Sequence, residues 1–113
     1  MDKIQLIVNH FNKLHATFLP SQNCGRYFVL YLSLHNNIIK IYDNINQDNF
    51  IDSIRLMSEH IYYSSNKLNL MRPQTKKQID TLHYERLNKL IQYSLQIINN
   101  IIYNACAISS IDR

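Results

Sequence analysis

Basic side chains gather around one short stretch in the second half of the chain. Within eleven residues that contain no acid lie four cations, Lys67, Arg72, Lys76 and Lys77. Two tyrosines, Tyr62 and Tyr63, come just before them. Cationic side chains attract phosphate groups or the acidic surface of a protein, and tyrosine rings can stack on nucleic-acid bases. The cluster therefore indicates a solvated basic loop, with an anion-binding surface as the alternative.

A second group of functional residue types lies directly upstream, in the stretch Arg55-Leu-Met-Ser-Glu-His60-Ile-Tyr62. An arginine, four residues, a histidine, one residue and a tyrosine resembles the signature of HEPN-type ribonucleases, which are all-helical toxins that act as dimers. The resemblance implies metal-independent RNA cleavage in a cleft between two subunits. His60 would be the acid or base, Arg55 would neutralise the developing phosphorane charge, and Tyr62 would position the pair. The alternative is a surface Arg55 paired with Asp52 or Glu59 one turn away.

The composition argues against several other kinds of site. The five histidines show no pair at i, i+4 and no cysteine partner, so no zinc site is predicted. The single glycine leaves no glycine-rich phosphate loop, and two glutamates are too few for a carboxylate-bridged two-metal bundle. Cys24 and Cys106 are expected to be free thiols, because a helical bundle would place them near opposite ends. We therefore expect no metal or cofactor, and no catalytic residue outside the ribonuclease pattern.

The elements that must carry these residues are predicted from the hydrophobic pattern. With one glycine and two prolines in 113 residues, the chain lacks the turn residues of a sandwich or barrel, which favours long helices. Apolar residues at helical spacing predict helices at 3–19, 26–42, 49–63 and 74–106, the last starting at a capping box of Thr75 and Gln78. Residues 64–73 are expected to form the main loop. A strand is the alternative for 27–32, which is rich in aromatic and β-branched residues.

The last predicted helix is the longest, and its apolar face is wider than packing on one neighbouring helix requires. Its apolar positions span about half of the circumference, and its length is roughly 45 Å at ~1.5 Å per residue. We expect a single all-α domain over residues 1–113, an antiparallel four-helix bundle whose last helix overhangs or packs on a second copy as a homodimer. The residues expected at that interface are Ile97, Ile98, Ile101 and Ile102.

The function expected from these features is non-enzymatic binding. A small helical chain with a net charge of +4 and few candidate catalytic groups fits a stoichiometric complex with another protein, as formed by immunity proteins, inhibitors, antitoxins or chaperones. Ribonuclease activity through the Arg55–His60–Tyr62 pattern is one alternative, and nucleic-acid binding through the basic cluster at 67–77 is the other. No stretch of ~18 residues is apolar enough to span a membrane and no secretion signal is visible, so we expect a cytoplasmic location.

Overall fold

The computed structural model describes residues 2–18, 25–73 and 78–111, with side chains for 3–15, 26–73 and 81–104. Over these residues it contains four helices and no strand, which confirms the all-α prediction and makes the strand alternative for 27–32 wrong. The helices are α1 (Asp2–Phe18), α2 (Gly25–Asp43), α3 (Phe50–Leu70) and α4 (Gln78–Ile111). The predictions for Cys24, for the capping box and for the side chain of Cys106 fall outside the described residues.

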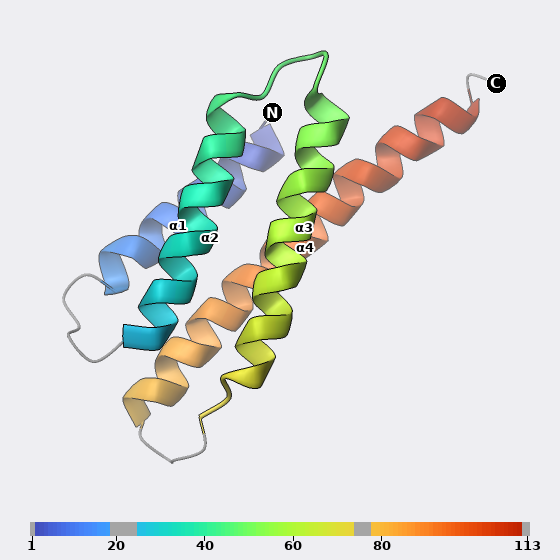
Figure 1. Cartoon of the computed structure of the whole chain (residues 1–113). Helices are drawn as coiled ribbons and strands as arrows, with labels where there is room; N and C mark the ends of the chain where they lie inside the picture. Colours follow the sequence, from blue (N-terminus) through green and yellow to red (C-terminus); the bar gives the residue numbers. More distant parts are fainter. Residues whose placement is uncertain (1, 19–24, 74–77, 112–113) are drawn as a thin grey trace.

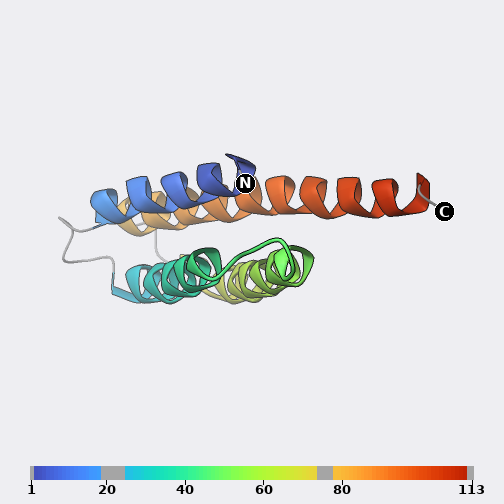
Figure 2. The same ribbon diagram turned by 90° about the horizontal axis from the view of Figure 1, so that it is seen from above.

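The helices form two layers, with α1 and α4 in one layer and α2 and α3 in the other (Figure 2). α3 packs most extensively on α4 and on α2, and α4 contacts each of the other three helices. Across the described residues, α1 and α3 make no close contact with each other. The C-terminal end of α4 extends beyond the other helices (Figure 1), so the molecule is elongated, with principal extents of 54 × 24 × 17 Å.

The core is built from one apolar stripe on each helix. The buried positions recur every three or four residues, which is the spacing that places side chains on one face of a helix. Ser94 is also fully buried in α4, and its Oγ donates a hydrogen bond of 2.8 Å to the carbonyl of Leu90 one turn earlier. The largest fully buried side chains are Ile4, Ile7 and Phe11 from α1, Tyr27, Tyr31, Leu34 and Ile38 from α2, and Ile54, Met57, Ile61 and Leu68 from α3.

The loop expected at 64–73 is wrong in its first seven residues, because α3 continues to Leu70. Ser64 and Leu68 are buried and continue the stripe of Met57 and Ile61 at the same spacing. The helical spacing of buried residues is hard to recognise in this polar stretch, because a serine takes one of the buried positions. The helix ends where the backbone N–H of Met71 donates to the carbonyl of Leu68 at 2.9 Å, just before Pro73.

The connection between α2 and α3 is held by two asparagines that bond to each other's backbone. The N–H of Asn46 donates to Oδ1 of Asn49 at 2.7 Å, and the N–H of Asn49 donates to Oδ1 of Asn46 at 3.0 Å. The Nδ2 of Asn49 also donates to the carbonyl of Asn44 at 3.0 Å. The side chain that precedes α3 is therefore used to close the turn, and it makes no capping bond to the helix itself.

A stack of rings packs α1 against α2. Tyr31 lies with its ring centroid 6.0 Å from that of Phe11 and 5.5 Å from that of His35. The rings of Phe11 and His35 are nearly parallel, at 9° and 5.9 Å. The Tyr31 hydroxyl donates to the carbonyl of Phe11, and burial raises the pKa of that hydroxyl. Nε2 of His35 lies 3.1 Å from Oδ1 of Asn12. The cluster thus joins the two layers through both ring packing and hydrogen bonds.

The cluster also brings two histidines together. The ring centroids of His15 and His35 are 5.6 Å apart. Burial, and secondly the charge of His15, lower the pKa of His35. A lowered histidine pKa means that the folded protein binds protons less readily than the unfolded chain does. The neutral form of His35 is therefore the one that suits this packing.

We expect the extension of α3 to contribute strongly to stability. Leu68 is 1% exposed and Leu70 is 88% exposed, so the two leucines of the last turn form a matched pair. Leu68→Ala should lower the free energy of unfolding by about 2–5 kcal/mol, because it leaves a cavity in the core. Leu70→Ala should change it by less than about 0.5 kcal/mol. Urea titrations measure both, and equal losses would contradict the buried register of this turn.

The fold should also lose stability in acid through His35. Stability present at neutral pH is lost as the pH falls below the unfolded histidine value of about 6.5 and toward the lower folded value. The urea midpoint should therefore fall between about pH 7.5 and pH 5, and His35→Phe should make that fall smaller. Leu70→Ala, at an exposed position of α3 outside the cluster, is the control and should keep the wild-type slope. An unchanged slope in His35→Phe would contradict this account.

Candidate functional site

Two grooves between neighbouring helices each bring lysine, histidine and tyrosine side chains together. The first, which we call the α2/α3 groove, consists of two adjoining hollows of about 430 and 310 Å³ that share Asn37 and His60. Its remaining lining residues are Val29, Leu30, Ser33, Lys40 and Ile41 from α2, Asn44 just after α2, and Ser53, Leu56, Tyr63, Ser64 and Lys67 from α3. Residue numbers rise along α2 where they fall along α3, so the two helices run in opposite directions along this groove.

The lining residues of each wall of the α2/α3 groove recur at intervals of three or four, so they share one face of their helix. Small side chains such as Ser33, Ser53 and Ser64 leave space between the helices. Large apolar side chains nevertheless stand at its surface: Val29 and Tyr63 are each 66% exposed, and Leu56 is 44% exposed. The charged lining residues are Lys40 and Lys67, both exposed, and no described carboxylate lines the groove.

Three of the candidate residues predicted from sequence come together here. His60, Tyr63 and Lys67 all line the α2/α3 groove, since positions three and four residues apart on α3 share a face. Tyr62 lies outside it: its hydroxyl accepts a hydrogen bond of 3.3 Å from Nδ2 of Asn99 on α4. The two adjacent tyrosines therefore serve different helix contacts.

The ribonuclease pattern is carried by an unbroken helix. Arg55 is exposed and lines neither groove, whereas His60 is half-buried beside α2. Residues five apart on a continuous α-helix point about 140° away from each other. One chain therefore does not direct Arg55 and His60 to a common point, and RNA cleavage stays a prediction that this geometry does not support.

The basic cluster predicted at 67–77 is only partly described. Lys67 is exposed and faces the α2/α3 groove. Arg72 is exposed too, but its Nε donates a hydrogen bond of 3.2 Å to the hydroxyl of Tyr84 on α4. Lys76 and Lys77 lie outside the described residues. The two described cations are thus directed to different helices.

The isoleucines expected at a dimer interface lie where α4 leaves the bundle. Ile98 is fully buried, so its side chain makes its contacts within the chain. Ile97, Ile101 and Ile102 are half-buried against the core. Tyr103 is 72% exposed on the next position.

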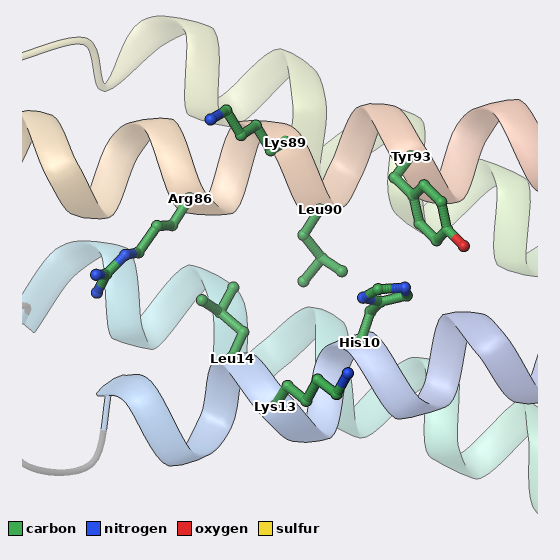
Figure 3. Close-up of a pocket in the computed structure, with 7 residues that line it drawn as sticks. All are labelled: His10, Lys13, Leu14, Arg86, Lys89, Leu90 and Tyr93. Atoms are coloured by element: carbon green, nitrogen blue, oxygen red, sulfur yellow. The ribbon is translucent and has the colours of Figure 1, made fainter.

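A second groove, between α1 and α4, was missed by the sequence analysis. This α1/α4 groove has a volume of about 450 Å³ and is lined by His10, Lys13, Leu14, Arg86, Lys89, Leu90 and Tyr93. Figure 3 shows Leu14 and Leu90 pointing toward each other across it, with His10 and Tyr93 facing each other at one end. The rings of His10 and Tyr93 meet edge to face at 4.5 Å. The only signal in the sequence was the spacing of Arg86, Lys89 and Tyr93 on one face of α4.

In the described part of the chain, no three histidine, cysteine, aspartate or glutamate side chains lie close enough together to hold a metal ion. Among the helices as described, none combines the length and the apolarity needed to cross a bilayer.

Comparisons of this chain with family models, with curated proteins and with solved structures find no significant match.

Proposed function

We propose that the protein is a non-enzymatic binding protein that takes up an amphipathic helix of a partner protein in the α2/α3 groove. The observation that carries the proposal is the exposure of three large apolar side chains, Val29, Leu56 and Tyr63, along one groove. Single exposed apolar residues are ordinary on a protein surface, but a row of them beside a hollow is typical of an interaction site.

The dimensions of the groove suit a helix. Its lining runs along α2 from Val29 to Ile41, which is roughly 18 Å at ~1.5 Å per residue. A helix lying in such a groove contacts it with apolar side chains at i, i+3, i+4 and i+7. The tyrosine contributes a large ring with a polar end, the combination that is enriched among residues that dominate binding energy.

The charge of the groove restricts the partner further. Lys40 and Lys67 stand at its surface and no described carboxylate lines it. A partner helix with acidic residues beside its apolar face would complement these lysines, whereas a basic helix would be repelled. The partner proposed is therefore an acidic amphipathic helix, and its identity within the immunity, inhibitor, antitoxin or chaperone classes is left to experiment.

Peptide display tests this proposal directly. The immobilised protein should enrich peptides of about 20 residues that are net acidic and apolar at helical spacing. Tyr63→Ala should weaken a selected peptide by tenfold or more, which corresponds to ~1.4 kcal/mol or more. Isothermal titration or fluorescence anisotropy measures the change.

The neighbouring tyrosine provides the matched control. Tyr62→Ala removes the same ring one residue away, on the side of α3 that faces α4. It should leave peptide affinity within about threefold. Selected peptides that are basic, or that lose equal affinity in the two variants, would overturn the α2/α3 groove as the binding site.

Self-association through the end of α4 is the second part of the proposal. Its support is the extension of α4 past the other helices (Figures 1 and 2) together with the half-buried Ile97, Ile101 and Ile102 and the exposed Tyr103. A symmetric contact between two copies would cover these side chains.

Sedimentation equilibrium measures this association. At high concentration we expect a mass of twice the 13.5 kDa of one chain. Tyr103→Glu should lower the dimer fraction, because it places a charge on an exposed apolar contact without entering the core. Leu70→Glu, at the exposed end of α3, should not lower it. A wild-type protein that stays monomeric at all concentrations would end the homodimer proposal.

A further inference from the structure

We propose that the α1/α4 groove is a separate binding site for single-stranded nucleic acid. It lies on a different pair of helices from the α2/α3 groove and shares no lining residue with it. The proposal therefore stands or falls independently of peptide binding.

The first argument is charge. Arg86 and Lys89 on α4 and Lys13 on α1 are among the lining residues, and no described carboxylate is. Figure 3 shows Arg86 extending toward α1 and Lys89 extending away from it. Within the described residues, Arg86 and Lys89 are exposed and form no hydrogen bond or ion pair. Glu85 is next to Arg86 in sequence, but it is exposed and is not part of the lining. The exposed cations Arg86 and Lys89 are therefore accessible to the phosphates of a strand.

The second argument is the surface between the cations. Leu14 and Leu90 form an apolar centre, and the ring pair of His10 and Tyr93 closes one end (Figure 3). A volume of about 450 Å³ lies in the range of ligand-sized pockets. Apolar and aromatic surface accommodates the flat face of a base regardless of its sequence.

These two features together distinguish a nucleic acid from an acidic protein. Carboxylates alone would use the cations and leave the aromatic end without a role. A strand presents phosphates and bases at alternating positions, and binding sites for single strands combine a cationic groove with aromatic rings in the same way. A duplex is disfavoured, because its bases are stacked inside and offer no face to the groove.

The experiment measures fluorescence anisotropy of labelled oligo(dT) and oligo(U) of 15 nucleotides with the full chain over a range of salt concentrations. Arg86→Gln should raise Kd several-fold, and the double variant Arg86→Gln/Lys89→Gln should raise it by tenfold or more. For the double variant the slope of log K against log salt should also become shallower by ~1.4, at ~0.7 per lost phosphate contact on a single strand. Tyr93→Leu should raise Kd about fivefold or more while the salt slope stays unchanged, since stacking releases no counterions.

The matched control is Arg55→Gln. It removes the same charge from an exposed arginine on α3, in the other layer, and should leave Kd within about twofold. All variants are first checked for helical content by circular dichroism, and only folded ones are compared.

Four results would overturn the assignment. The first is the absence of binding by the wild type at low salt, and the second is an equal effect of Arg55→Gln and Arg86→Gln. The third comes from competition: displacement of the oligonucleotide by poly-glutamate as readily as by unlabelled strand would assign the groove to an acidic protein. Displacement by a free mononucleotide at the same molar concentration would assign it to a small nucleotide instead of a strand.

Discussion

The packing of α4 against all three other helices is the contact on which the rest of the structure depends. α1 and α3 do not contact each other across the described residues, so α4 and α2 are what hold them in one molecule. Buried residues of α4, among them Leu87, Ile91 and Ile98, recur at helical spacing and belong to the hydrophobic core. α4 itself forms one wall of the α1/α4 groove. It also holds α3 in place, and α3 forms one wall of the α2/α3 groove.

Much of this architecture could be predicted from the sequence because helical periodicity is a local property. The positions of α1 and α2, the length of α4 and the stripe of Ile54, Met57 and Ile61 all follow from spacing within one segment. A loop was wrongly predicted at 64–70 because the polarity of these residues does not reflect which of them are buried. Ser64 is buried for its small size, and its neighbours in sequence face solvent, so the segment resembled a loop.

The sites were less predictable, because they depend on which helices lie side by side. His60, Tyr63 and Lys67 belong to separate predictions from the sequence, as an acid–base group, a stacking ring and a cation. They share one groove only because α3 continues through Lys67 instead of ending near Tyr63. Predicting the α1/α4 groove requires knowing that Lys13 and Arg86 line the same hollow, although most of the chain separates them in sequence. No pattern within either helix alone contains that pairing.

Ser94 shows how a residue outside a site can determine its width. It is fully buried in α4, one turn beyond Leu90, and its hydroxyl is satisfied by that residue's own carbonyl. A larger side chain at this position would have no empty volume to occupy and would have to push the helices apart. Changes in the serine would then alter the distance between Leu14 and Leu90 across the groove while every lining residue stays the same. The width of the α1/α4 groove is therefore open to adjustment from the interior of the bundle, through the thickness of the core, as well as from its surface.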